Sequence, residues 1–409
     1  MGLRVLLAAT VCWPTTARIA GGLVQLGCSV DAFCPSGAPV HESRFVNLRH
    51  AYNALSPLTS LRDALSISRP DLIIACDDRA VQNLLRLREL EPQSAQARLV
   101  GHSLGAPDNY PAMISRASFM KEAQALGICV PETIALTKES QIEPALAKIG
   151  LPAVLKADGS WGGDGVAIVH TREEAIAAWR KLSTPLSTLR SLARTLRRGD
   201  IHHFLAAIRP VRPVVSIQHF VAGTPATTAF SAWNGDVSAT IHMDVVVSQG
   251  VTGPASVLRR VECADMEGAA RAIARRFALS GLHGLDFIRD AAGRVHLLEI
   301  NPRATQTSYL ALGHGHDLLA GLVASASGRG QAPRFPTTTN NLIALFPQEW
   351  ARDSASPYLK TAYHDIPWED PGLLRACIAS SRPQGRRFPT AAALLPAVIR
   401  PYGQQGTVH

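Results

Sequence analysis

The sequence predicts an α/β and α+β fold, in which an open parallel α/β domain precedes a larger α+β unit. Three observations lead to this prediction. The 409 residues are too many for one ordinary core, strands and helices alternate over the first 110 residues, and consecutive strands follow from about residue 214. We expect domain boundaries at 1–112, 113–330 and 331–409, with a lid subdomain at about 130–220 and a small C-terminal lobe at the end.

The first domain is predicted from its order of elements. Residues 3–9 (LRVLLAA) form an apolar strand, a helical pattern runs from about Thr16 to Gln25, and the strand SVDAF follows Gly27. PDLIIACDD is typical of a buried strand, and AVQNLLRLREL is typical of an amphipathic helix. Strands and helices in this order predict a parallel sheet covered on both faces.

Two aspartates, Asp77 and Asp78, end the third predicted strand. Ligands often bind at the carboxyl end of a strand in such sheets, so these side chains are candidates for a binding site. They are equally suited to cap the next helix, and we favour the cap. No G-x-G-x-x-G follows the first strand, so the fingerprint of a dinucleotide site is missing.

The second unit begins with SRASFMKEAQALGICVPET, a predicted helix that Gly127 closes. LPAVLKADGSWGGDGVAIV is predicted as strand, glycine-rich loop and strand, and consecutive strands follow in VVSIQHFVAGTPATTAFSAWNGDVSATIHMDVV. A helix from about Met266 to Leu279 leads into GLDFIRDAAGRVHLLEINPR, a hairpin. Beyond about residue 330 the helical segments GLLRACIASS and AALLPAVI form the predicted C-terminal lobe.

The hairpin carries three side chains with oxygen ligands. Glu299 and Asn301 are two residues apart, so both leave the same face of their strand. Cross-strand pairing places Asp286 opposite Leu297 or Glu299, on that same face. Mg²⁺ prefers oxygen ligands and binds through one or two carboxylates together with substrate phosphates. The alternative is a surface hairpin whose polar residues face water.

Positive charges accompany these oxygen ligands in the sequence. Arg303 follows the hairpin at once and would suit a phosphoryl group in transit. Lys156 closes a strand, and a glycine-rich loop follows it. The members of this loop that we expect to contact phosphate are Gly159, Ser160, Gly162 and Gly163. A plain hairpin turn is the alternative, and the absence of a G-K dipeptide excludes a Walker-type P-loop.

Together, the segments SRASFMKEAQALGICVPET, AVLKADGSWGGDGV, IQHFVAG and GLDFIRDAAGRVHLLEINPR resemble the ATP-grasp superfamily, which includes D-alanine–D-alanine ligase. The resemblance covers residues 113 to about 310, and the residues before 113 are similar to the α/β domain that usually precedes the ATP-grasp fold. It implies an ATP-dependent ligase that activates a carboxylate as an acyl phosphate for attack by an amine or a thiol. It also implies ATP and Mg²⁺ as cofactors, with two ions expected and Mn²⁺ able to take their place.

The resemblance also implies roles for single residues. Arg303 and Lys156 would be catalytic, and Lys156 with the glycine-rich loop would contact the ATP phosphates. Arg116 takes the place of a lysine that the family usually has there. The remaining nucleotide contacts would come from Gln218, His219, Phe220 and Val221, which hold adenine, and from Leu298 beneath the base. The metal ligands would be Asp286, Glu299 and Asn301.

One motif suggests a different enzyme class. Gly101 to Gly105 (GHSLG) fits the nucleophile elbow of serine hydrolases, which makes Ser103 a candidate nucleophile. Pro107 and Pro111 follow closely and predict a turn in place of the long helix that an elbow needs, so we favour a linker between domains. A serine hydrolase, and an ATP-grasp nucleotide-binding protein without ligase activity, remain the alternatives to the ligase.

Composition limits the partners and the location. A net charge of +9 suits anionic ligands such as nucleotides without requiring nucleic acid. The segment LSTLRSLARTLRRGD predicts an amphipathic helix whose arginine face is either solvated or binds phosphate. Seven scattered cysteines without CxxC spacing favour a reducing cytoplasm, and no apolar run is long enough to span a membrane. We expect small-molecule carboxylate and amine substrates, and a homodimer is compatible with such an enzyme.

Overall fold

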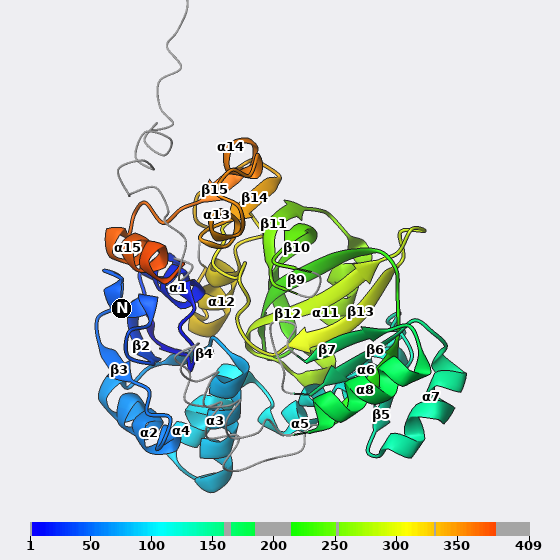
Figure 1. The fold of residues 1–409 in the computed structure, drawn as a ribbon. Helices are drawn as coiled ribbons and strands as arrows, with labels where there is room; N and C mark the ends of the chain where they lie inside the picture. Colours follow the sequence, from blue (N-terminus) through cyan, green and yellow to red (C-terminus); the bar gives the residue numbers. More distant parts are fainter. Residues whose placement is uncertain (1, 159–164, 185–213, 251–252, 331–332, 382–409) are drawn as a thin grey trace, which may run out of the picture.

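The computed structural model describes residues 2–158, 165–184, 214–250, 253–330 and 333–381. Three β-sheets organise the chain, as Figure 1 shows: a parallel sheet near the amino terminus, a small sheet at the opposite side, and a large central sheet. The glycine-rich loop and the predicted arginine-rich helix lie outside the described residues, as does the AALLPAVI segment.

The first sheet has four parallel strands in the order β3-β2-β1-β4, which confirms the predicted parallel α/β arrangement. Its strands are β1 (Arg4–Ala8), β2 (Ser29–Cys34), β3 (Arg49–Ala51) and β4 (Leu72–Ala75). The elements around it are α1 (Pro14–Gln25), the 3-10 helix η1 (Pro39–Glu42), α2 (Pro57–Ser68), α3 (Asp78–Leu90) and α4 (Ala95–Leu104). Side chains alternate along β1, so Val5 and Leu7 face one hydrophobic core while Leu6 and Ala8 face another.

Helix α4 contains the GHSLG motif, where the sequence predicted a linker. Ser103 is fully buried in the last turn of α4, and its Oγ accepts a hydrogen bond of 2.9 Å from the backbone N–H of Ile73 in β4. A nucleophile elbow has a strand before the serine and a helix starting after it, whereas here the residues before Ser103 are already helical. Gly105 ends the helix at φ 89°, where a Cβ would lie 2.0 Å from the carbonyl oxygen of Ala278. The motif is therefore a helix terminus, and the linker prediction is wrong.

The second sheet is antiparallel, in the order β5-β8-β6-β7, and it lies within the predicted lid subdomain. Its strands are β5 (Thr133–Leu136), β6 (Ala153–Ala157), β7 (Val166–Val169) and β8 (Val215–His219). The helical elements before and beside it are η2 (Pro107–Asn109), α5 (Tyr110–Ile114), α6 (Arg116–Ala125), η3 (Glu139–Gln141), α7 (Ile142–Ile149) and α8 (Arg172–Ser183). A hydrophobic core of its own joins α7 and α8 to this sheet. The domain boundaries themselves stay a prediction.

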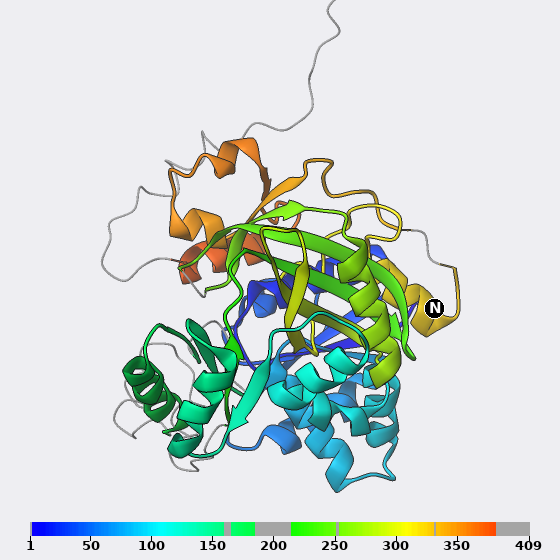
Figure 2. The same ribbon diagram turned by 90° about the vertical axis from the view of Figure 1, so that its right-hand side faces the viewer.

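The central sheet has seven strands in the order β13-β12-β9-β10-β11-β14-β15. Its strands are β9 (Thr224–Trp233), β10 (Asp236–Ser248), β11 (Ala255–Arg260), β12 (Gly281–Arg289), β13 (Val295–Asn301), β14 (Leu342–Leu345) and β15 (Tyr363–Asp365). Helix α11 (Ala264–Phe277) covers the face that carries Phe230 and Ala232, and α12 (Leu318–Ser327) covers the face that carries Ile241 and Met243. The two helices therefore lie on opposite faces of the central sheet, and Figure 2 shows α11, in green, in front of it with the blue first sheet behind.

The segment after residue 330, for which the sequence predicted a small C-terminal lobe, pairs with the central sheet and packs against the first domain. Strand β14 pairs with β11, and β15 pairs with β14, so this segment extends the central sheet. Its helices are α13 (Gln348–Arg352), α14 (Tyr358–Thr361) and α15 (Pro371–Ser380). Helix α15 packs against η1 and α1 of the first domain (Figure 1). Within the described residues, none of the helices combines the length and apolarity that a membrane crossing requires.

Candidate active site

The three predicted metal ligands lie together on the hairpin of β12 and β13. Asp286 is the cross-strand partner of Glu299, and Gly284 is the partner of Asn301. The Asn301 amide Nδ2 donates a 2.9 Å hydrogen bond to Asp286 Oδ2. Gly284 is required here because a Cβ at this position would lie 2.3 Å from Thr305 Cγ2. Three oxygen-bearing side chains therefore meet on one face of the sheet, as the alternation of the sequence predicts.

A β-bulge decides which residue lies opposite Asp286. Phe287 pairs with Leu297, whereas Asp286 pairs with Glu299, so Leu298 is an extra residue in β13. In a regular antiparallel register, the pairing of Phe287 with Leu297 would place Leu298 opposite Asp286. The sequence left Leu297 and Glu299 as alternatives because strand periodicity alone does not reveal a bulge.

Two cations reach this hairpin from other elements. Lys156, at the end of β6, is buried. Arg116 begins α6, and its Nη2 lies 2.8 Å from Glu299 Oε2. The other terminal nitrogen of Arg116, Nη1, lies 3.5 Å from Asp158 Oδ1. The site therefore combines residues from the second sheet, from α6 and from the central sheet.

The charges of the site shift one another's ionisation. Burial, and then the nearby Glu299 carboxylate, raise the pKa of Asp286 to about 6. Burial alone would raise the pKa of Glu299 as well, but the charges of Arg116 and Lys156 lower it below its usual value. Burial lowers the pKa of Lys156 to about 8, although Glu299 opposes this change. Such displaced pKa values in one cluster are typical of functional sites.

Arg303 connects the hairpin to the first domain. Its Nη2 donates to Asn301 Oδ1 at 3.0 Å, and its Nε donates to Asp78 Oδ2 at 3.1 Å. The guanidinium carbon lies 5.5 Å from the ring centre of Trp13, within the range of a cation–π contact. Arg303 is buried, so its charge is held by these neighbours in a fixed position.

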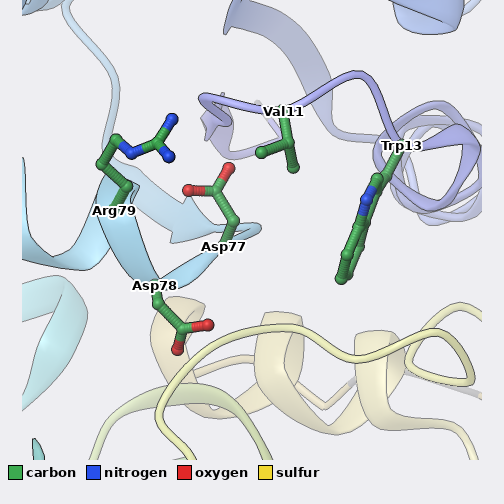
Figure 3. Close-up of a pocket in the computed structure, with 5 residues that line it drawn as sticks. All are labelled: Val11, Trp13, Asp77, Asp78 and Arg79. Carbon is green, nitrogen blue, oxygen red and sulfur yellow. The ribbon is translucent and has the colours of Figure 1, made fainter. Parts of the chain in front are cut away.

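A pocket opens beside Arg303, at the carboxyl ends of β1 and β4. It is open to solvent and is lined by Val11, Trp13, Asp77, Asp78 and Arg79. Figure 3 shows Trp13 on one side of the pocket and the beginning of α3 on the other, with the Asp77 carboxylate turned towards the Arg79 guanidinium. A backbone hydrogen bond of 3.0 Å from the N–H of Ala304 to the carbonyl of Ala75 joins this edge of the first sheet to the loop after β13.

The two aspartates of this pocket differ in their partners. Asp77 caps α3, because its Oδ1 accepts from the N–H of Ala80 at 2.9 Å and from the hydroxyl of Thr10 at 2.8 Å. Asp78 is part of the helix itself and is bound to Arg303. The cap interpretation is therefore correct for Asp77, and Asp78 belongs to the candidate site.

The predicted adenine segment connects the second sheet to the central sheet. Gln218 is buried in β8, and its Nε2 donates to the hydroxyl of Thr133 at 2.9 Å, so its side chain is committed to the sheet. The ring of the exposed His219 lies 3.0 Å, through Nδ1, from the carbonyl oxygen of Ile149. Phe220, Val221 and Leu298 are half-buried. A base could contact the backbone of this segment, and its role stays a prediction.

Gly159, Ser160, Gly162 and Gly163 lie outside the described residues, so the structure says nothing of their contacts. The ends of the loop are described. The N–H of Ala157 donates to the carbonyl of Gly165 at 2.9 Å, which closes the hairpin of β6 and β7 around the loop. Gly159, the first residue of the loop, follows Lys156 by three positions in the sequence.

Sequence analysis missed two residues of the site. Trp13 lies beyond the end of β1, and no motif marks it; only its place after the first strand of a parallel sheet could have indicated it. Asp158 follows the predicted Lys156 by two residues, and burial raises its pKa despite the opposing charge of Arg116. Its closeness to Arg116 depends on the packing of α6, which sequence periodicity does not show.

Comparisons with known proteins show what this chain is similar to. No protein-family model matches the chain. A stretch of 200 residues, which is 48% of this chain, is 32% identical to the carbamoyl phosphate synthase large chain of Methanoregula boonei. The matched stretch covers 17% of that protein. The protein of the same name from Myxococcus xanthus is 27% identical over 217 residues, which are 52% of this chain and 18% of that protein. The chain thus spans less than a fifth of the length of these relatives.

Solved structures are similar over most of the chain. The biotin carboxylase domain of the 2-oxoglutarate carboxylase of Hydrogenobacter thermophilus, solved with MgADP and bicarbonate, has a TM-score of 0.59 at 14% identity, covering 82% of this chain and 71% of its own. Carboxyaminoimidazole ribonucleotide synthase from Aspergillus clavatus, complexed with ATP, has a TM-score of 0.59 at 13% identity. The match covers 82% of this chain and 80% of that protein. At this identity the likeness shows the fold alone.

Proposed function

We propose that this chain, which has the ATP-grasp fold, is an ATP-dependent ligase that joins a carboxylate to an amine, or to a thiol. The observation that carries the proposal is the cluster of Asp286, Glu299 and Asn301 in register on one hairpin, with Lys156 and Arg116 beside it. Two carboxylates, one carboxamide and two cations suit the triphosphate of ATP and its counter-ions better than they suit an ordinary ion-pair network. Ligase relatives with the same fold support the proposal.

The donor set of the hairpin fits Mg²⁺. Asp286 and Glu299 face each other closely enough to raise the pKa of Asp286, and a divalent cation would relieve that repulsion. All three side chains offer oxygen, which Mg²⁺ prefers over nitrogen and sulfur. Asp286, Glu299 and Asn301 would hold the two ions, or Mn²⁺ in their place. Bound there, the metal would neutralise charge on the phosphates of ATP.

The side chains of the chain itself position the nucleotide. Lys156 and Arg116 would bind phosphate oxygens, and the glycine-rich loop after Lys156 would cover them and exclude water. Arg303 lies between the hairpin and the first-domain pocket, so it would contact the phosphoryl group as it moves from ATP to the acid. In phosphoryl transfer, such positioning and charge neutralisation supply most of the catalysis.

The proposed reaction has two steps. A carboxylate oxygen attacks the γ-phosphorus of ATP, the bond to the bridging oxygen breaks, and ADP leaves while an acyl phosphate remains. The amine nitrogen then attacks the acyl carbon, the bond from that carbon to the phosphate oxygen breaks, and phosphate leaves with the proton that the nitrogen loses. Each turnover therefore releases one ADP and one phosphate.

We place the small-molecule substrate in the pocket between Trp13 and Asp78. The pocket adjoins Arg303, so a carboxylate bound there would lie near the transferred phosphoryl group. The pocket is in the first domain, so substrate would reach the hairpin of β12 and β13 from the side opposite the second sheet. A cytoplasmic location and a homodimer remain part of the proposal.

Release of ADP tests the proposal directly. The purified chain is incubated with Mg·ATP and a panel of carboxylic acids, with and without amines. We expect ADP only when Mg²⁺ and a suitable acid are both present, and we expect Glu299→Gln to lower the rate at least 100-fold because a metal ligand loses its charge. Glu143→Gln is the matched control, since Glu143 also pairs with an arginine but is exposed on the surface.

Two other results would identify the alternatives. Mg·ATP that raises the melting temperature without ADP release across the whole panel would indicate a nucleotide-binding protein that lacks ligase activity. Ester hydrolysis that disappears in Ser103→Ala would indicate a serine hydrolase, which the buried position of Ser103 argues against.

A further inference from the structure

A second group of reactive side chains lies at the turn end of the same hairpin. Cys129 is exposed and lies in the segment between α6 and β5. Its carbonyl accepts a 2.9 Å hydrogen bond from the N–H of Leu297, so the segment runs alongside β13. Cys129 Sγ lies 3.3 Å from His296 Nδ1, and His296 Nε2 lies 3.0 Å from Asp290 Oδ2. The three side chains form a continuous chain from thiol to imidazole to carboxylate.

The direction of each hydrogen bond follows from the state of Asp290. His296, the backbone N–H of Arg294 and the Arg294 side chain hold the pKa of Asp290 well below its usual range, although its partial burial opposes them. An ionised carboxylate can only accept, so His296 Nε2 carries the hydrogen of this contact. When the imidazole is neutral, Nδ1 is then an acceptor, and the hydrogen between His296 Nδ1 and Cys129 Sγ comes from the thiol. A base that a carboxylate orients, next to a thiol, is the arrangement that activates cysteine nucleophiles.

The other contacts of this group strengthen the arrangement. The backbone N–H groups of Ala292 and Arg294 donate to Asp290 Oδ1 at 2.9 and 3.0 Å, which fixes the carboxylate within the turn. The Arg294 Nε lies 2.9 Å from Asp290 Oδ2. His296 and Asp290 are mostly shielded from solvent, with side chains 13% and 12% exposed, whereas Cys129 is open to it. The thiol is therefore accessible, while the imidazole and the carboxylate that orients it are held in place.

We propose that Cys129, His296 and Asp290 form a nucleophilic thiol site that reacts with small disulfides. As Cys129 Sγ attacks one sulfur of the disulfide, its proton passes to His296 Nδ1. A new S–S bond forms, the S–S bond of the reagent breaks, and the departing sulfur takes the electron pair as a thiolate. That thiolate takes the proton back from His296, so the products are a mixed disulfide on Cys129 and one free thiol.

A small disulfide is the substrate class that this geometry fits. Exchange needs an accessible sulfur, a base for its proton and an acid for the leaving sulfur, and the three side chains supply all of these. No second protein sulfur has to approach, since the disulfide reagent supplies the other sulfur atom. The site uses none of the residues that we assign to ATP or metal, so the inference does not depend on the proposed ligase activity.

The test uses the intact chain, glutathione disulfide at pH 7, and mass spectrometry of the digested protein. We expect modification of Cys129 to be at least tenfold faster than modification of Cys12, which is also exposed and serves as the internal reference. His296→Gln should slow the reaction of Cys129 at least tenfold and leave Cys12 unchanged, and Asp290→Asn should slow it less. Cys129→Ser should abolish the fast reaction.

A slower reaction of a variant has to be distinguished from unfolding of that variant. Each variant is first checked for an unchanged melting temperature and far-ultraviolet circular dichroism. If Asp290→Asn disturbs the turn, His296→Gln alone decides the result, because His296 holds no backbone of the turn. Equal rates at Cys129 and Cys12, or a rate at Cys129 that His296→Gln does not change, would overturn the proposal.

Discussion

At the scale of single residues, the candidate site shows how burial and charge act on each other. Asp286 has a raised pKa, Glu299 a lowered one, and Lys156 a lowered one, although all three lie in the same cluster. The differences arise because Glu299 has Arg116 at 2.8 Å while Asp286 has a neutral amide at 2.9 Å. Binding of a polyanion and its metal, which we propose, would change the neighbouring charges that set these pKa values.

His283 shows the opposite situation, a buried histidine that stays neutral. It is fully buried next to Phe230, its Nε2 lies 2.9 Å from the carbonyl oxygen of Ser280, and within the described residues its Nδ1 is buried without a partner. Burial lowers its pKa to about 4. Since the unfolded chain titrates near 6.5, the unfolded state takes up a proton between these two values and the folded state does not. Its contribution to stability is therefore lost as the pH falls from about 6.5 to 4.

We predict that His283→Gln flattens this acid dependence. Between pH 7 and pH 5 the wild type should lose about 2 kcal/mol more unfolding free energy than the variant does. Urea denaturation at the two pH values measures the difference. His364, whose pKa burial also lowers to about 4, is unchanged in both proteins and cancels from the comparison. Identical pH slopes for the two proteins would contradict the prediction.

At the scale of elements, the contacts between strands and their neighbours decide the geometry of the site. Gly284 in β12 lies so close to the loop after β13 that an added Cβ would meet Thr305 Cγ2 at 2.3 Å and Asn301 Cβ at 3.6 Å. The position of Asn301 and of the loop that carries Arg303 therefore depends on having a residue without a side chain at position 284.

We predict that Gly284→Ala lowers the rate of ADP release at least tenfold, because it displaces Asn301 and the loop after it. The second substitution Thr305→Ser removes Cγ2 but keeps the hydroxyl that contacts Ser308. The double variant should recover most of the activity, as steady-state ADP release can show. An inactive double variant with an unchanged melting temperature would mean that the close contact does not position the site.

For Ser103 in helix α4, we predict a loss of stability without a loss of activity. Ser103→Ala should leave ADP release unchanged while it lowers the unfolding free energy by about 1 to 3 kcal/mol, because the buried N–H of Ile73 loses its acceptor. Denaturant unfolding and the ADP assay on the same preparation separate the two effects. Loss of activity at full stability would restore the nucleophile hypothesis.

At the scale of the whole molecule, the first domain, the central sheet and the C-terminal segment share one core. A single hydrophobic cluster includes residues of β1, α12, β14 and α15. A buried polar group reinforces it: Asp365 of β15 binds both Arg18 of α1 and the hydroxyl of Tyr309. This group fixes α1, and therefore Trp13 at its start, relative to the central sheet.

We predict that Asp365→Ala destabilises the protein by about 3 kcal/mol or more, because it leaves the buried Arg18 charge without its main partner. Glu369→Gln is the control, since Glu369 contacts the same arginine at 3.2 Å but is 45% exposed, and it should cost less than about 1 kcal/mol. Urea denaturation of both variants provides the measurement. Equal costs for the two would show that burial does not set the strength of this contact.

The sequence by itself was sufficient for the parallel first sheet, for the hairpin and for the shared face of Glu299 and Asn301. These features depend on local periodicity and on turn residues, which are written in the order of amino acids. It also identified Lys156 and Arg303 as the charges beside that hairpin. It did not place Asp286 opposite Glu299 with certainty, since a bulge leaves no periodic signal.

Only the tertiary structure brought Asp158 and Trp13 to the site, and only it showed that GHSLG ends a helix and that β14 and β15 belong to the central sheet. The physical reason is the same in each case. These contacts join elements far apart in the chain, so they depend on which apolar faces pack together and on how closely. Packing of this kind is a property of the whole core, and no local pattern of residues records it.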